Sequence, residues 1–195
     1  MASERIESLI AQMTVEEKVG QLGVFADMVR PFAPDVNPEA NVSNADQVLQ
    51  QVREGKVGSL FNGVGVEAGR RIQQVALEES RLGIPLLFGM DVIHGYETVF
   101  PIPLALSCTW DMEAVELSAR IAARECSADG INWTFSPMLD VCHDARWGRV
   151  SEGNGEDPYL NARIAEAMVY GYQGRPGSQF EKDNQIMACV KHFAL

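Results

Sequence analysis

Residues 143–157 combine charge, glycine and an aromatic ring in a short stretch. Three basic and four acidic residues occur there with Trp147 and three glycines, and the stretch follows an apolar run at 131–135. Glycine lets the backbone bend tightly, the tryptophan needs an apolar environment, and so many charges must pair with each other or with a ligand. The pattern predicts a structured loop that could hold a polar ligand.

Two other polar groups also follow apolar runs. Asp91 comes shortly after residues 84–89, and Lys191 and His192 follow residues 185–190. A carboxylate can accept hydrogen bonds from two sugar hydroxyls at once, although it can equally cap a helix or join a loop salt bridge.

Lys191 and His192 are adjacent, and in a regular strand their side chains would point to opposite faces. Joint binding of one ligand therefore requires an unusual dihedral or a non-proline cis peptide at this point. The alternative is that both side chains simply occupy a surface loop.

Arg146 and Arg149 stand three residues apart around Trp147 and Gly148. A guanidinium group stays charged and binds carboxylates with two parallel hydrogen bonds. One arginine could hold an acidic residue of the loop while the other faces a ligand, and residue chemistry alone does not choose between them. The acidic candidates are Glu152, Glu156 and Asp157.

Short apolar runs alternate with helical patterns along the chain. Thr14, Asp111 and Asp157 each have the residue type and position of a helix cap, and the proline-rich segment 31–44 is expected to be a loop. Short strands that are apolar on both faces and separated by helices predict a parallel sheet covered by helices. The strands are expected at 19–25, 57–61, 84–89, 131–135 and 185–190.

Two α/β architectures fit this alternation, a doubly wound sheet and a TIM-type (β/α)8 barrel. The polar groups favour the barrel, because all of them follow strands and barrel enzymes place their chemistry at the carboxyl ends of strands. The glycines at 63, 65 and 69 do not have the spacing of the dinucleotide-binding fingerprint. Only about the first five of eight β/α units are present, so residues 1–195 are expected to be the N-terminal portion of a larger barrel.

Composition narrows the range of partners. A net charge of −11 argues against binding to nucleic acid or to an anionic membrane surface. No stretch has the roughly 18 uninterrupted apolar residues that span a bilayer, and no signal-peptide core follows Met1. The compartment stays open: cytoplasmic, or periplasmic or secreted with the signal removed.

The cysteines do not indicate a metal site. Cys108, Cys126, Cys142 and Cys189 show no CxxC spacing, and only three histidines accompany them. Buried thiols are expected, with a disulfide left open, and no metal or other cofactor is implied.

Three motifs together carry a family resemblance. The segments Asp91-Val-Ile-His-Gly95, Asp144-Ala-Arg-Trp-Gly-Arg149 with its acidic continuation, and Lys191-His-Phe-Ala194 occur in the order and spacing of glycoside hydrolase family 3. The sequence most resembles the bacterial β-glucosidases of that family. The resemblance implies that Asp91, Arg149, Lys191 and His192 bind the substrate sugar and that Arg146 has a structural role.

The resemblance also implies a reaction. The expected function is cofactor-free hydrolysis, with retention of configuration, of terminal non-reducing β-D-glucosyl residues from an oligosaccharide or an aryl β-glucoside. The family places its Asp nucleophile late in the barrel and its Glu acid/base in a following α/β domain, and neither motif occurs in residues 1–195. Both catalytic residues are therefore expected beyond Leu195, in the remaining part of the enzyme, and Asp91, Asp140, Asp144 and Glu156 are not assigned as nucleophile.

Three alternatives stay open. A β-xylosidase of the same family differs in one substituent of the sugar ring. A β-N-acetylglucosaminidase commonly has Pro-Gly after Lys-His-Phe, where this chain has Ala194-Leu195, which favours the glucosidase. The third is a non-catalytic carbohydrate-binding or assembly fragment, expected if residues 1–195 are a complete product.

Overall fold

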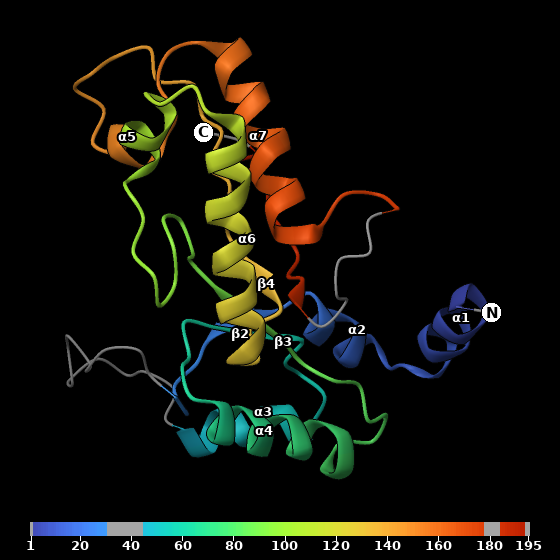
Figure 1. The fold of residues 1–195 in the computed structure, drawn as a ribbon. Coiled ribbons are helices and arrows are strands. Elements are labelled where there is room, and N and C mark those ends of the chain that lie inside the picture. Colours follow the sequence, from blue (N-terminus) through green and yellow to red (C-terminus); the bar gives the residue numbers. More distant parts are fainter. Residues whose placement is uncertain (1, 31–44, 178–183, 194–195) are drawn as a thin grey trace. The chain divides into compact units, whose positions relative to one another are not determined.

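A computed structural model describes residues 2–30, 45–177 and 184–193. The chain divides into two compact units, residues 1–89 and 90–195, and each is described here by itself (Figure 1). The loop expected at 31–44 and Ala194 of the last motif lie outside the described residues.

The first unit alternates helices with parallel strands. Phe25 in β1 pairs with Leu60 in β2, and Leu60 pairs in turn with Phe88 in β3, all in parallel. This pairing confirms the predicted α/β class with a parallel sheet. The elements are α1 (Ala2–Gln12), α2 (Val15–Gln21), β1 (Val24–Ala26), α3 (Ala45–Arg53), β2 (Ser59–Phe61), α4 (Val66–Gln74), the π-helical turn η1 (Val75–Glu79) and β3 (Leu87–Met90).

The core of this unit is formed by residues of its strands, of α3, and of α4 with η1 (Figure 1). Each helix buries one apolar face, as its periodicity predicts. The buried residues are Val48, Val52, Val57, Leu60, Ile72, Ala76, Leu86 and Phe88.

The strand predicted at 19–25 is wrong over its first half, because α2 continues to Gln21. The predicted capping box starts this helix: the Thr14 hydroxyl accepts from the Glu17 N–H at 3.2 Å, and Glu17 accepts from the Thr14 N–H at 2.8 Å. Gly20 then lets the helix approach the backbone at Gly55, where an added Cβ would lie 2.5 Å from a carbonyl oxygen. The helix start and this close approach outweigh the strand propensity of the apolar residues.

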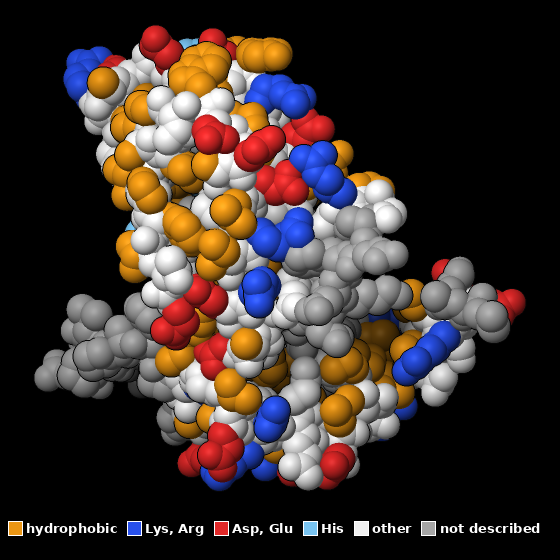
Figure 2. Space-filling model, viewed as in Figure 1, with side chains coloured by type: hydrophobic (Ala, Val, Ile, Leu, Met, Phe, Trp, Pro, Cys, Tyr) orange, Lys and Arg blue, Asp and Glu red, His pale blue; other side chains and the backbone are white. Residues whose placement is uncertain are grey.

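The second unit contains α5 (Pro103–Ser107), α6 (Met112–Ala128), β4 (Trp133–Thr134), the 3-10 turn η2 (Val150–Glu152) and α7 (Pro158–Gln173). The predicted caps are confirmed, because the carboxylates of Asp111 and Asp157 accept backbone N–H groups at the starts of α6 and α7. In the face shown in Figure 2, acidic and basic side chains are interspersed over α6 and α7.

The strand predicted at 185–190 is not continuous. Two isolated parallel bridges join Trp133 to Met187 and Met138 to Lys191. Between the bridges the first segment advances five residues and the second only four, so one extra residue interrupts the ladder like a bulge. The two segments therefore meet, but without regular strand pairing.

The cysteines only partly match expectation. All four are free; Cys126 and Cys142 are buried, Cys189 is half-buried and Cys108 is exposed. Cys108 follows the five-residue α5 and lies outside the core, with its thiol donating to the Leu104 carbonyl.

Helices α6 and α7 pack side by side through a glycine (Figure 1). An added Cβ at Gly171 would lie 2.4 Å from the Ala119 Cβ and 2.6 Å from the Glu116 carbonyl oxygen. The next residue, Tyr172, is fully buried and donates its hydroxyl to the Val92 carbonyl at 2.8 Å. The close helix contact thus places Tyr172 to hold the backbone next to Asp91.

We predict that Gly171→Ala destabilises the protein by about 1–3 kcal/mol, the usual cost of overpacking a core. The expected sign is diagnostic, because alanine in a helix that has room for it would stabilise the protein by about 0.5–1 kcal/mol. Urea unfolding measures the change. Gly148→Ala is the control, since a Cβ there meets nothing within 4 Å; a stabilised Gly171→Ala protein would contradict the packing described.

A second prediction concerns Glu17, which accepts two hydrogen bonds from Arg81, at 2.9 and 2.5 Å. The Arg81 hydrogen bonds lower the pKa of Glu17 below its usual 4.5, and the Thr14 N–H acts in the same direction. A lowered folded-state pKa contributes stability that is complete above the unfolded value and is lost as the pH falls through the folded value.

We therefore expect Glu17→Gln to lower the free energy of unfolding at neutral pH and to have a smaller effect in acid, well below 4.5. Urea titrations at the two pH values measure the difference. Glu67→Gln removes an exposed ion pair with Arg71 and serves as control. An equal loss at both pH values would show that the ionised form of Glu17 is not what stabilises this contact.

Candidate functional site

The four sequence-predicted residues converge within the second unit. Lys191 Nζ lies 3.0 Å from Asp91 Oδ1, although 100 residues separate them in the sequence. His192 Nε2 lies 3.2 Å from Arg149 Nη1. Because Lys191 and His192 are neighbours, these two contacts bring all four side chains to one place.

The backbone at Lys191 and His192 departs from a regular strand. The Lys191-His192 peptide bond is cis, one of the two irregularities expected from the sequence. Lys191 is held on both sides of its backbone, since its N–H donates to the Pro137 carbonyl at 3.2 Å and its carbonyl accepts from Leu139 N–H at 2.7 Å.

The loop of residues 143–157, called the glycine-rich loop below, positions Arg149 through its acidic residue Glu152. Arg149 makes two hydrogen bonds with Glu152, at 2.8 and 2.6 Å, and it also reaches His192. Arg146 instead pairs with Asp144, and its side chain is 90% exposed. The structure therefore distinguishes the two arginines: Arg149 both holds an acidic loop residue and faces the site.

Asp140 belongs to the same cluster, and sequence analysis did not assign it there. Its Oδ2 lies 2.5 Å from His192 Nδ1, and its Oδ1 accepts from the His192 backbone N–H at 3.2 Å. The side chain is only 5% exposed. A usable signal existed, because Asp140 follows an apolar run after β4 just as Asp91 follows β3.

A second layer of contacts fixes the segment that carries Asp140. Asn154, from the glycine-rich loop, donates to the Met138 carbonyl at 3.3 Å and to Asn161 Oδ1 at 2.8 Å. Both asparagines are buried. The loop and the start of α7 thus support the backbone beside the site.

Contacts within the cluster shift the pKa values of its charged groups. Burial works to raise the pKa of Asp140, but hydrogen bonds from the ring and backbone of His192 outweigh it, so the pKa lies below its usual value. The Arg149 hydrogen bonds lower the pKa of Glu152. The Glu152 carboxylate likewise raises the pKa of Arg149. Both carboxylates are therefore ionised at neutral pH.

The arrangement offers donors and acceptors to a polar ligand. Lys191 and Arg149 donate, the Asp91 carboxylate accepts, and Asp91 is 43% exposed and so reachable from solvent. Each positive group lies beside a negative one, which suits a neutral ligand rich in hydroxyl groups.

Neither a metal centre nor a membrane span is found in the part of the chain that the structure describes. Residues 2–30, 45–177 and 184–193 contain no group of three or more His, Cys, Asp or Glu side chains placed to hold a metal ion. Within the same ranges no helix combines the length and apolar character needed to cross a bilayer.

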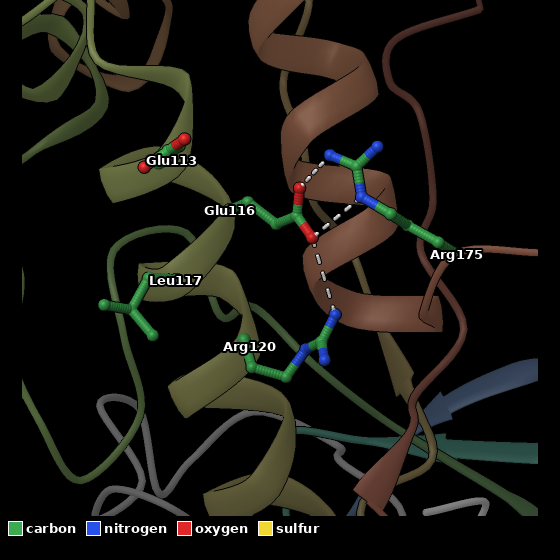
Figure 3. Close-up of a pocket in the computed structure, with 5 residues that line it drawn as sticks. All are labelled: Glu113, Glu116, Leu117, Arg120 and Arg175. Carbon is green, nitrogen blue, oxygen red and sulfur yellow. Dashed lines mark hydrogen bonds and ion pairs between the residues drawn. The ribbon is translucent and has the colours of Figure 1, made fainter. Parts of the chain in front are cut away.

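A hollow of about 280 Å³ lies elsewhere in the second unit, between α6 and the end of α7 (Figure 3). Its charged residues serve the fold: Glu116 pairs with Arg175 at 2.5 Å, and Arg120 donates to the carbonyls of Tyr170 and Gly171 at the end of α7. These contacts join the two helices. We therefore assign the hollow a structural role.

Comparison with known proteins connects this chain to a family. The model of the glycosyl hydrolase family 3 N terminal domain matches residues 14–195. A periplasmic beta-glucosidase of Salmonella typhimurium is 40% identical over 190 residues, which cover 97% of this chain and 23% of that protein. A beta-xylosidase of Formosa agariphila is 36% identical over 162 residues, covering 77% of this chain and 22% of that protein.

Solved structures agree with the sequence relatives. The beta-glucosidase from Listeria innocua in complex with isofagomine is 43% identical and superimposes with a TM-score of 0.83, covering 99% of this chain and 26% of that chain. Structures of the same protein also contain glucose or, in a mutant, laminaribiose.

The chain spans about a quarter of the length of these relatives. The match to the family model covers nearly the whole chain, and the helices and parallel strands agree with part of a TIM-type barrel. The chain therefore belongs to glycoside hydrolase family 3, as part of the barrel-type N-terminal domain of that family.

Proposed function

We propose that the complete enzyme containing this chain hydrolyses terminal non-reducing β-D-glucosyl residues of oligosaccharides or aryl β-glucosides, with retention of configuration. The observation that carries the proposal is the convergence of Asp91, Arg149, Lys191 and His192. The names of the relatives support it, since several of the most similar proteins are beta-glucosidases. In this proposal the four residues bind the terminal sugar.

The chemistry of the cluster suits a sugar. A sugar hydroxyl both donates and accepts hydrogen bonds, so a pair such as Lys191 and Asp91 can bind one hydroxyl or two neighbouring ones. In the absence of sugar, the same groups satisfy each other. Paired charges also keep the site close to neutral overall, as a neutral substrate requires.

The carboxylates of the cluster are poorly suited to bond cleavage. A retaining glycosidase needs a nucleophilic carboxylate and a second carboxyl group roughly 5 Å away whose raised pKa lets it donate a proton. Asp140 and Glu152 have lowered pKa values and are held by His192 and Arg149, and Asp91 is held by Lys191. We infer that the nucleophile and the acid/base come from segments after Leu195, in the rest of the barrel and a second α/β domain.

A β-xylosidase is the second candidate, because beta-xylosidases occur among the relatives. One of them, from Dickeya chrysanthemi, is a beta-glucosidase/beta-xylosidase. The two substrates differ only in the hydroxymethyl group of the sugar ring. Comparing nitrophenyl β-glucoside with nitrophenyl β-xyloside as substrates of the complete enzyme separates the candidates.

We predict that Asp91→Ala in the complete enzyme lowers kcat/KM for an aryl β-glucoside at least about tenfold, since a hydrogen bond to a charged group contributes about 1.5–3 kcal/mol. The melting temperature should change little, because Asp91 is 43% exposed and an ion pair that solvent can reach contributes about 1 kcal/mol. Asp144→Ala, which removes a carboxylate paired with Arg146 at the surface, is the control. Unchanged kcat/KM with a greatly lowered melting temperature would show that Asp91 serves the fold.

The 195-residue chain by itself is predicted not to hydrolyse nitrophenyl β-glucoside. It holds the proposed binding residues, but the loss of each catalytic group removes a factor of about 100 or more. The assay compares the purified chain with the complete enzyme, and activity is expected only in the latter. Robust turnover by the isolated chain would refute the proposed location of the catalytic residues.

A further inference from the structure

We propose that Asp140 is a positioning residue that keeps the His192 proton on Nδ1, so that Nε2 faces the substrate as a hydrogen-bond acceptor. The role of the substrate rests on the function proposed above. The position of the proton rests only on the geometry around the imidazole ring.

Asp140 determines the state of Nδ1. Its Oδ2 lies 2.5 Å from Nδ1, and an ionised carboxylate can only accept hydrogen bonds. Nδ1 must therefore carry a proton for this short contact to be favourable.

Arg149 determines the state of Nε2. Its Nη1 lies 3.2 Å away, and a guanidinium group can only donate. A proton on Nε2 would place two donors against each other. The two neighbours thus favour the same neutral tautomer, with a proton on Nδ1 and an acceptor lone pair on Nε2, which Arg149 occupies in the absence of substrate and which a donating sugar hydroxyl would take over.

Both neighbours are fixed in place. Asp140 is almost fully buried and also accepts from the His192 backbone N–H, so both of its oxygens are used by one residue. Arg149 is held by the two hydrogen bonds that it donates to Glu152. The imidazole ring of His192 therefore cannot easily flip to exchange the partners of Nδ1 and Nε2.

This tautomer requires a substrate hydroxyl that donates a hydrogen bond to Nε2 of His192. Lys191 and Arg149 donate to oxygen atoms of the sugar, whereas Asp91 and Nε2 of His192 require hydroxyl groups that donate to them. Replacing the hydroxyl that meets His192 by fluorine, which cannot donate, should therefore weaken binding. A protonated Nε2 would instead donate to the substrate, and because fluorine can still accept weakly, the penalty for fluorine should then be smaller.

Asp140→Asn tests the role of the carboxylate without changing the size of the side chain. An asparagine has one oxygen and one NH2 group, whereas His192 presents two donors, the backbone N–H and Nδ1–H. If the oxygen keeps the backbone contact, the NH2 group faces Nδ1 and drives the proton to Nε2, against Arg149. A wrong tautomer of this kind greatly lowers activity in enzymes whose histidine is held by an aspartate.

The first measurement is 15N magic-angle-spinning NMR of the complete enzyme labelled at histidine, with His192 assigned from the signal lost in His192→Gln. We expect protonated Nδ1 and unprotonated Nε2 in the wild type, and a proton on Nε2 in Asp140→Asn. A protonated Nε2 in the wild type, or an unchanged tautomer in the variant, overturns the proposal. If the variant fails to fold, the wild-type spectrum still decides where the proton lies.

The second measurement is kcat/KM for aryl β-glucosides in which one hydroxyl at a time is replaced by fluorine. Asp140→Asn should lower kcat/KM for the unmodified glucoside about tenfold or more. At one ring position it should also reduce the penalty that fluorine causes in the wild type. Asp144→Asn, which changes a nearby carboxylate paired with Arg146, should change neither kcat/KM for the glucoside nor the fluorine penalties. Equal fluorine penalties in wild type and Asp140→Asn would overturn the acceptor role of His192.

The two measurements separate this inference from the proposed function. If the complete enzyme hydrolyses no β-glycoside, the proposed function fails, while the NMR spectrum still tests the pairing of Asp140 with His192. If the enzyme is active and the spectrum shows the other tautomer, only the inference about Asp140 fails.

Discussion

The site depends on the parallel contact between the segments 132–139 and 187–191. Backbone hydrogen bonds from Met187 to Lys191 attach the end of the chain to the segment that follows β4. This contact carries Lys191 to Asp91 and His192 to Asp140 at the same time. The extra residue between the two bridges interrupts the ladder just before the polar side chains, so regular strand pairing ends where the site begins.

The polar side chains of the site form a connected series of hydrogen bonds, in which each side chain restricts the position of the next. Glu152 holds Arg149, Arg149 meets His192, and His192 is held from its other side by Asp140. Removing one member of such a network leaves its partner unsatisfied, which is costly where the group is buried. Through this coupling, Asp140 could affect the proposed binding of the sugar without touching it.

The sequence was sufficient for the features that depend on local chemistry. The capping residues Thr14, Asp111 and Asp157 start helices where predicted, because a cap acts on backbone groups only two or three residues away. Convergence of Asp91 and Lys191 was also predictable, since both follow apolar runs expected as strands of one parallel sheet, whose carboxyl ends lie at the same edge. The end of α2 was not, because the approach of Gly20 to Gly55 is a tertiary contact that outweighs local apolar character.

The contacts that Asp140 and Arg149 make with His192 could not be predicted from residue types. Asp140 was named only among the carboxylates that are not assigned as nucleophile, and spacing alone did not indicate that it could hold a histidine nitrogen. That role requires Asp140 to lie within 2.5 Å of Nδ1 while Arg149 lies 3.2 Å from Nε2, and this geometry is set by segments more than 40 residues apart. A carboxylate that ends an apolar run is therefore as well suited to orienting a histidine as to attacking a substrate, and its partners in the fold decide between the two. In this chain the partners of Asp140 favour orientation, which agrees with the proposal that this segment binds the sugar while other parts of the enzyme cleave the bond.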